Sequence, residues 1–562
     1  MDLNVTRVGA TPTYGYGLFA TSDLNRGDVV LSICNPSLLT VENQALNIVC
    51  GFCFAEAGDD VQLCPCSQCG IMKFCSDVCQ AAALSPEGPH HLECFCLRQL
   101  QDSRDQSGVR NEITPTVIRA TIQLLFRQVS ASTPYDPEIT QLATHQDQIK
   151  QNKTKWEDIQ LQARASASFS KKNESFDLAV ELLCRLSTNA FRVESNLGNG
   201  PIGLCLDPVL ARVNHSCRPN AAITFNGRCA TLRALFPIAK DEQIFISYID
   251  ESQRGEVRRA ALKESWFFTC DCARCTEPSL ASSYRNFLES PVVYPASLDT
   301  LIPYNETKKF SEKVLREAVP TDILRLYSSL HVIRHIEHLN ANPSTLPVGP
   351  ALNRRLEALK ANISSLNDFL LIHRFIQPFP TLLNEIYLIY LQKADYMSAL
   401  IILLFLVIYI DPVEYPSPYH PQRATRLLAL YKLLKLDIFD ANTIAQYTED
   451  HDMPSSIFAE VDWFAARCMV LNAVKEVGGK CWGSESRVMV EVERDDDEMK
   501  AILKSPAGKN GIAGMDLRKT GRNLKRVAGY VFDLVGLVSA DYGLFDFWAM
   551  DNWGRAEREE MR

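Results

Sequence analysis

Eight residues of the kinds that bind zinc occur as four close pairs in the first fifth of the chain. The pairs are Cys50-x2-Cys53, Cys66-x2-Cys69, Cys75-x3-Cys79 and His90-x3-Cys94. A close pair lets one turn of chain offer two ligands to one ion, and zinc favours four soft or borderline ligands. The four pairs therefore predict two tetrahedral zinc sites.

The order of the pairs favours two interleaved sites, in which the first pair joins the third and the second joins the fourth. Interleaving cross-links a short segment that lacks the apolar mass for a core of its own. Three neighbours are alternative ligands: Cys64, His91 and Cys96. Cys66 is preferred because it completes an x2 pair with Cys69, and His90 because it lies one helical turn before Cys94. Sites closed by four protein ligands leave no open position for water, so they indicate a structural role.

Composition is that of an ordinary globular protein. A chain of 562 residues is too long for one core and predicts several structural units. The formal net charge of −9 disfavours wholesale binding to nucleic acid and suits a basic partner such as a lysine-rich peptide. The 19 cysteines cluster at metal spacings, and thiolates must stay reduced to bind zinc. We therefore expect a cytoplasmic or nuclear protein, or one found in both places.

Neither secretion nor a membrane is indicated by the sequence. The first residues, Met1–Val5, show no basic region followed by an apolar core, so no signal peptide is expected. The most apolar stretch, Met397–Ile410, is too short to span a bilayer and predicts a buried helix.

Hydrophobic patterning divides the chain into segments. Residues 1–48 and 188–250 look rich in strands, with a turn at Gly15–Gly17, and a helix is expected at about 251–265. Residues 97–187 and 277–562 show helical periodicity. The polar stretch 130–175 predicts a mobile surface insertion, and Asp495–Asp497 predicts a solvated loop.

The ligand pattern at 49–96 resembles a MYND zinc finger, whose relatives often bind proline-containing peptides. A finger inserted after a β-rich start with a Gly-x-Gly turn resembles the SET-and-MYND (SMYD-like) protein lysine methyltransferases. The rest of the match is Asn214-His215-Ser216-Cys217-x-Pro219-Asn220 and a later strand that ends in Tyr248. In SET proteins these two segments cross in a pseudo-knot, a rare threading among folds. The resemblance covers residues 5–275, with a looser likeness beyond.

This resemblance implies a multidomain α+β fold. A β-rich SET fold would be formed by residues 1–48 and 188–250, with the MYND finger at 49–96 and a helical insertion at 97–187 between them. A cysteine-rich post-SET segment would follow at 251–276, and an all-helical, TPR-like lobe would occupy 277–562. The post-SET cysteines, Cys270, Cys272 and Cys275, supply three ligands. Cys217 would complete a third zinc site, with a water or another residue as the alternative.

The implied activity is methyl transfer from S-adenosylmethionine to a lysine of a protein substrate. The implied cofactor-binding residues are Tyr14, Gly15, Tyr16, Gly17, Asn189, Asn214 and His215. The glycines would let backbone approach the cofactor closely, and His215 would act through its backbone and packing more than as a base. Tyr16 stands where relatives commonly carry asparagine, which weakens one expected contact.

Tyr248 matches the catalytic tyrosine of the family. Its hydroxyl would orient the lysine amine, and the alternative is a tyrosine that merely fills the core. Phe191, Trp266 and Phe268 would line a lysine channel, where aromatic walls attract an alkylated ammonium group. Because relatives often carry tyrosine in place of Trp266, the number of methyl groups added stays open.

Two other classes of protein compete with the enzyme. A scaffold could bind peptides through the finger and the helical lobe while its SET core is weak or inactive. The substituted Tyr16 favours that scaffold, whereas the intact segment at 214–220 and Tyr248 favour the enzyme. A zinc-dependent DNA-binding factor is disfavoured by the acidic balance and by the lack of a basic groove-reading helix.

Overall fold

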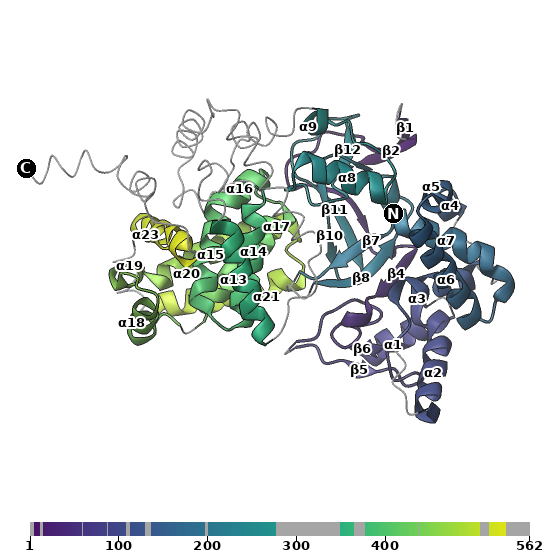
Figure 1. Ribbon diagram of the computed structural model, residues 1–562, viewed down its shortest axis with the longest axis horizontal. Coiled ribbons are helices and arrows are strands. Elements are labelled where there is room, and N and C mark those ends of the chain that lie inside the picture. The colour runs from purple at the N-terminus through teal and green to yellow at the C-terminus, as the bar shows by residue number, and fades with distance from the viewer. Residues whose placement is uncertain are drawn as a thin grey trace, which may run out of the picture. The chain divides into compact units, whose positions relative to one another are not determined.

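The computed structural model describes residues 5–11, 15–58, 60–86, 88–107, 113–129, 137–196, 200–276, 349–364, 377–436, 438–505 and 516–535. Contacts divide the chain into two compact units. The first holds residues 1–250 and 256–276, and the second holds 251–255 and 277–562 (Figure 1).

Short strands and helices alternate in the first unit, which confirms the predicted α+β class. The strands are β1 (Thr6–Thr11), β2 (Gly15–Ala20), β3 (Val29–Ile33), β4 (Leu38–Val41), β5 (Cys64–Pro65), β6 (Lys73–Phe74), β7 (Phe191–Glu194), β8 (Pro201–Leu206), β9 (Asn214–His215), β10 (Ala221–Asn226), β11 (Cys229–Ala234) and β12 (Gln243–Ile246). They form sheets in the orders β1-β2-β12-β9, β10-β11-β3, β4-β8-β7 and β5-β6.

The first sheet joins segments that are far apart in the sequence. β12 pairs antiparallel with β2, setting Ile244 opposite Leu18, and parallel with β9, setting Ile246 opposite His215. Leu18 and Ile244 are fully buried, and their apolar side chains fix this register. The sheet therefore places the Gly-x-Gly segment beside the segment that begins at Asn214.

One hydrophobic core serves the strands and the zinc-finger segment together. Buried residues of β2, β3, β8, β10, β11 and β12 pack with Cys50, Cys66, Cys69 and Cys94. Met72 and Phe74 of the finger are almost completely buried in the same cluster. The finger thus gains from the sheets the apolar contacts that its own short length cannot supply.

Helices cover the rest of the first unit. They are α1 (Asp77–Leu84), α2 (Pro89–Ser107), α3 (Thr116–Val129), α4 (Pro137–Thr140), α5 (Gln146–Lys150), α6 (Lys153–Phe169), α7 (Phe176–Asn189), α8 (Gly255–Ser265) and α9 (Ala273–Thr276), with 3-10 turns η1 (Asn43–Ala45), η2 (Asn173–Ser175) and η3 (Leu210–Arg212). A core beneath α3, α6 and α7 includes Leu38 of β4, and the three helices lie together in Figure 1.

The expected mobile insertion at 130–175 is wrong for its described part. Residues 153–169 form α6, which buries Ile159 and Ala163 against its neighbours. Asn152 caps this helix by accepting from the Lys155 backbone N–H. Many residues of this helix are small or polar, so its apolar face is difficult to recognise in the sequence. The helix is stabilised by tertiary packing more than by its local sequence.

Helices also make up the second unit as far as the structure describes it. They are α13 (Pro350–Ser364), α14 (Phe379–Gln392), α15 (Tyr396–Phe405), the π-helical η6 (Leu406–Ile410), α16 (Asp411–Glu414), α17 (Pro421–Leu434), α18 (Ala441–Asp450), α19 (Ser455–Ala459), α20 (Trp463–Cys481), α21 (Arg487–Lys504), α23 (Leu517–Gly529) and α24 (Val531–Leu534). The predicted helical lobe is confirmed, while its TPR-like repeat stays a prediction.

The most apolar helix belongs to the core of the second unit. Residues Tyr396–Glu414 are long and apolar enough to cross a membrane by composition, yet 89% of that window is buried within the protein. Such burial is expected for the central helix of a folded lobe. The prediction of a buried helix over Met397–Ile410 is confirmed.

Three local predictions need correction. Gly15–Gly17 lies within β2 instead of forming a turn, and the helix expected from residue 251 begins at Gly255. Asp495–Asp497 lies inside α21 and not in a loop. Asp496 is only 5% exposed and forms ion pairs with Lys475 and Lys500. These ion pairs stabilise the helix, and the acidic sequence around Asp496 does not reveal them.

Candidate active site and zinc centres

The twelve predicted zinc ligands lie in three groups in the structure. The groups are Cys50, Cys53, Cys75 and Cys79; Cys66, Cys69, His90 and Cys94; and Cys217, Cys270, Cys272 and Cys275. Within each group the ligand atoms lie within 4.8 Å of one another. Three or four thiolates with at most one imidazole form a donor set typical of structural zinc, so all three groups fit that metal.

Short elements of the finger aim the first two groups. Ser76 caps α1 by accepting from the Cys79 backbone N–H, which holds Cys79 3.5 Å from Cys75. The first turn of α2 presents His90, whose Nε2 lies 3.4 Å from the Cys69 sulfur. Of the alternative ligands, Cys96 instead contacts the Phe169 carbonyl and Cys64 is exposed in β5. The structure therefore brings together the eight residues that the spacing favoured.

A buried chain of polar groups supports His90 from behind. His90 Nδ1 lies 3.4 Å from Glu93, and Glu93 lies 3.3 Å from Arg119 of α3. All three side chains are nearly inaccessible to solvent. Burial acts to raise the pKa of Glu93, but the charge of Arg119 and the His90 contact outweigh it and lower that pKa. An ionised Glu93 would fix the imidazole so that Nε2 faces the metal.

Glu93→Gln should lower zinc affinity of the second group by roughly 10- to 100-fold, because the carboxylate orients the imidazole ligand. Zinc content after dialysis against a graded chelator series would measure this. Glu181→Gln is the matched control, since Glu181 forms a 3.0 Å pair with Arg185 outside the ligand groups. Equal zinc retention by the Glu93 variant and the control would remove Glu93 from ligand positioning.

His215 links the third group to Tyr248. Its Nε2 lies 3.2 Å from the Cys217 sulfur, and its Nδ1 accepts from the Tyr248 backbone N–H at 3.0 Å. Burial lowers the pKa of His215 to about 4, so the ring is neutral near pH 7. Because one ring nitrogen accepts a hydrogen bond and the other faces a zinc-type ligand, His215 has a structural role that connects Cys217 to the Tyr248 backbone. The geometry disfavours a role as a general base.

The Tyr248 hydroxyl donates to the Val213 carbonyl at 2.8 Å. The hydroxyl proton is therefore engaged, while the lone pairs of the oxygen can still accept a hydrogen bond. Burial raises the pKa of Tyr248 above its ordinary value, so the phenol stays protonated at neutral pH. Such a group can orient an amine, but it is a poor proton acceptor.

Aromatic rings surround Tyr248. The Trp266 ring lies 5.3 Å from the Tyr248 ring, and the Phe268 ring lies 6.0 Å from the His215 ring. Trp266 also donates from its indole nitrogen to the Thr188 carbonyl at 3.0 Å, which fixes the ring plane. Trp266, Phe268 and Tyr248 pack around the third cysteine group. Two of the three predicted channel residues are thus close to Tyr248.

Phe191 and Asn189 lie where α7 ends and β7 begins. Phe191 begins β7 opposite Cys205, and Asn189 ends α7. The Asn189 amide nitrogen donates to the carbonyls of Ala143 and Arg185, at 3.0 and 2.9 Å. Any ligand contact of the Asn189 side chain is therefore left to its amide oxygen.

The Gly-x-Gly segment meets Asn214 across the sheet. Gly15 has a φ of +73°, and a Cβ on Gly17 would lie 2.5 Å from the Gln243 amide, so both positions favour glycine. Asn214 donates to the Tyr16 carbonyl at 3.0 Å, while the Tyr16 side chain is 64% exposed. Tyr14 lies outside the described residues.

Some supporting residues were not predicted from the sequence. Glu93, Arg119 and Val213 act through partners brought together by the fold, and only Glu93, one turn after His90, carried a local signal. A disulfide between Cys34 and Cys229 was also not predicted. It joins the end of β3 to the start of its sheet neighbour β11.

Comparison with known proteins places these features in a class. Residues 15–249 match the SET domain family. The chain is 32% identical over 276 residues to "SET domain and MYND-type zinc finger protein 6" of Schizosaccharomyces pombe, covering 49% of this chain and 53% of that protein. It is 31% identical to the mouse "Histone-lysine N-methyltransferase SMYD3", with 47% and 60% covered, and 30% identical to "Histone-lysine N-methyltransferase ASHR1" of Arabidopsis thaliana, with 48% and 54% covered.

Residues 15–249 therefore match a SET domain, and the zinc-finger segment lies within that stretch. The chain is similar to proteins named for a SET domain and a MYND-type zinc finger, in agreement with the resemblance that the motifs predicted. The aligned part spans little more than half the length of each of these three relatives.

Proposed function

We propose that the chain is an S-adenosylmethionine-dependent protein-lysine N-methyltransferase. The observation that carries the proposal is the meeting of β2, β9 and β12, which joins Tyr16 to Asn214 and His215 to Tyr248. A segment near Tyr16 and two segments some 200 residues further along the chain would thus form one site, with Trp266 and Phe268 as walls. The methyltransferase names of the relatives support the same activity.

S-adenosylmethionine supplies a methyl group on a sulfonium, which a neutral lysine amine attacks in line with the departing sulfur. The groups that would hold this cofactor are the backbone at Gly15 and Gly17, with Tyr14 and Tyr16 beside them, and Asn189, Asn214 and His215. The φ of Gly15 and the crowding at Gly17 fit a backbone that approaches a ligand closely. Alignment of the two reactants is the main task left to the protein.

Tyr248 would position the lysine amine. Because its proton is donated to Val213, the hydroxyl oxygen can accept an amine N–H and direct the nitrogen lone pair at the methyl carbon. Phe191, Trp266 and Phe268 would form an apolar channel that excludes water and accommodates an alkylated ammonium. The amine proton would leave to solvent, because the raised pKa of Tyr248 keeps its phenol protonated near pH 7 and unable to take up that proton.

The zinc groups would hold this arrangement together. We propose a structural zinc ion in each group. We also propose the following division of the chain: the SET start at 1–48, the MYND finger at 49–96, the helical insertion at 97–187, the SET core at 188–250, the post-SET segment at 251–276 and the helical lobe at 277–562. The finger would take a proline-containing peptide as partner. The substrate would be a histone or another protein in the nucleus or cytoplasm, as the acidic charge suits a lysine-rich segment.

Elemental analysis should find about three zinc ions per chain, because each closed donor set fits one ion. Protein purified without chelators and dialysed free of loose metal is the sample to measure. A content of two would argue against the third group as a zinc site.

Transfer of a labelled methyl group from S-adenosylmethionine to core histones and cell-extract proteins tests the activity, with mass spectrometry locating the label. Label on lysine supports the proposal. If folded, zinc-loaded protein neither labels lysine nor binds the cofactor, the scaffold becomes the better account, as the exposed Tyr16 would then suggest.

A further inference from the structure

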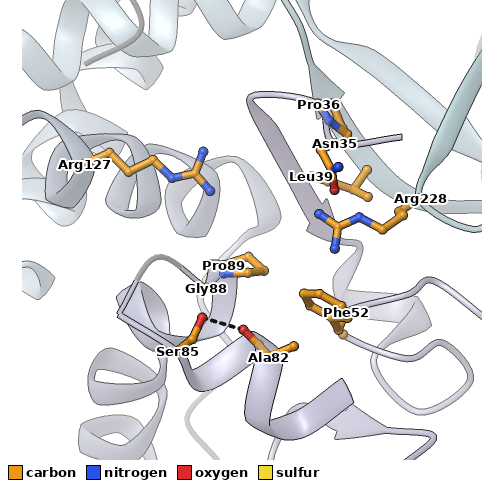
Figure 2. A pocket seen from close by; sticks show the side chains of 11 residues that line it. Asn35, Pro36, Leu39, Phe52, Ala82, Ser85, Gly88, Pro89, Arg127 and Arg228 are labelled. Atoms are coloured by element: carbon orange, nitrogen blue, oxygen red, sulfur yellow. Dashed lines mark hydrogen bonds between the residues drawn. The ribbon is translucent and has the colours of Figure 1, made fainter. Parts of the chain in front are cut away.

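A cavity of about 300 Å³ lies between the zinc finger and the neighbouring strands (Figure 2). It shares no residue with the site proposed for methyl transfer. Its walls combine the apolar side chains of Pro36, Leu39 and Phe52 with the guanidinium groups of Arg127 and Arg228. None of its lining residues is an aspartate or a glutamate. The lining therefore carries two guanidinium groups and no carboxylate, and the sulfurs of Cys53 and Cys79 are the nearby groups that act electrostatically on Arg228.

The two arginines reach the cavity from different elements. Arg127 extends from the last turn of α3, and Arg228 comes from the tight turn between β10 and β11. In Figure 2 their guanidinium groups enter from opposite sides and point toward each other. Within the described part of the chain, neither one forms an ion pair with a carboxylate.

Each arginine is anchored but keeps free donors. Arg127 donates to the Ser37 carbonyl through one terminal nitrogen. Arg228 donates to the Cys34 carbonyl at 3.1 Å through Nε and stacks over the Phe52 ring at 4.5 Å. A guanidinium has five N–H donors, so most donors of both groups are left for a ligand. The anchors fix the direction in which those donors point.

The turn that carries Arg228 is seated against the zinc finger. Gly227 has a φ of +55°, and a Cβ there would lie 2.6 Å from the Cys53 carbonyl. The zinc finger and the turn thus set the cavity width together. Burial lowers the pKa of Arg127, and the nearby charge of Arg228 adds to that effect. The ligand sulfurs of Cys53 and Cys79 act in the opposite sense on the pKa of Arg228, and an anion between the two guanidinium groups would reduce their mutual repulsion further.

We propose that this cavity binds a phosphate group. A guanidinium matches two oxygens of a phosphate in a planar fork, and a phosphate dianion has enough oxygens and charge to engage two arginines at once. A monocarboxylate has two oxygens and one charge, so it would satisfy one arginine. The volume is at the lower end for small-molecule sites, so the ligand is inorganic phosphate or a small phosphomonoester.

Calorimetric titration of the zinc-loaded full chain with inorganic phosphate, phenyl phosphate and acetate, at constant ionic strength, tests this site. Saturable one-to-one binding of phosphate is expected. Arg228→Gln and Arg127→Gln should each weaken it by about 10-fold or more, because each removes a positive charge and its charge-assisted hydrogen bonds to the anion. Arg228→Lys keeps the charge without the fork and should fall between wild type and Arg228→Gln.

Arg526→Gln is the control for lost charge, because Arg526 pairs with Glu460 in the second unit. Circular dichroism and zinc content identify any variant that has not folded. If Arg127→Gln does not fold, the two Arg228 variants still test the site. Tighter binding of phenyl phosphate would assign a phosphomonoester that uses Phe52, and equal or weaker binding would assign the free ion. Absence of saturable binding, acetate binding as tight as phosphate, or equal affinity in folded Arg228→Gln and the control would overturn the proposal.

Discussion

Tyr248→Phe is expected to lower methyl-transfer turnover by about 100-fold or more while leaving cofactor affinity nearly unchanged. The substitution keeps the ring that packs beside Trp266 and His215, and removes only the hydroxyl. That hydroxyl donates to the Val213 carbonyl and is the group that we propose orients the incoming amine. Its loss should appear in kcat more than in cofactor binding, because the contact matters most at the transition state.

Single-turnover transfer of labelled methyl, together with calorimetric cofactor binding, would separate these two effects. Tyr447→Phe is the matched control, because Tyr447 is also largely buried and its hydroxyl lies 2.9 Å from the Ser398 hydroxyl in the second unit. Both variants lose one hydroxyl hydrogen bond, a loss of about 1 kcal/mol of stability. Wild-type turnover in Tyr248→Phe would exclude the hydroxyl from the mechanism.

Ligand spacing predicted which residues gather around each zinc site because the constraint is local. A pair such as Cys66 and Cys69 must face one ion whatever surrounds it, and the order of pairs left few ways to combine them. The support behind the ligands is not local. Arg119 reaches Glu93 from a different helix, and no spacing rule connects the two.

The segments of the proposed active site were suggested by their resemblance to a family rather than by periodicity. Asn214 and Tyr16 are almost 200 residues apart, and only the sheet pairing brings them to 3.0 Å. The role of His215 as a connector depends on partners at both ring nitrogens, which a sequence does not show. The opposed arginines, Arg127 and Arg228, escaped prediction for the same reason.

The errors at α6 and α21 have a common cause. Both segments are polar enough to be taken for surface loops, yet each is held by distant contacts. Ile159 of α6 joins a core shared with α3 and α7, and Asp496 of α21 meets Lys475 of α20. Local polarity predicts solvent exposure only where no partner is supplied by the fold.

Cys272→Ser is expected to remove one zinc ion and to lower methyl transfer by about 10-fold or more, although Cys272 is proposed as a zinc ligand and not as a contact of either reactant. A hydroxyl is a far weaker zinc ligand than a thiolate, so the third group should lose its metal. Trp266, Phe268 and Tyr248 pack around this group, and His215 joins Cys217 to the Tyr248 backbone. Loss of the ion should therefore loosen the proposed channel wall, where a displacement of about 1 Å can reduce rate 100-fold.

Zinc content and turnover would be measured on the same preparations, with Cys468→Ser as control because Cys468 belongs to none of the three ligand groups. The control should keep about three zinc ions and wild-type turnover. The first two groups should keep their ions in Cys272→Ser, since the eight finger ligands form separate clusters within the finger segment. Full turnover with one zinc ion missing would show that the channel holds its shape without the metal. Full zinc content with low turnover would instead assign Cys272 a direct part in the site, contrary to the role that its packing around Trp266 and Phe268 supports.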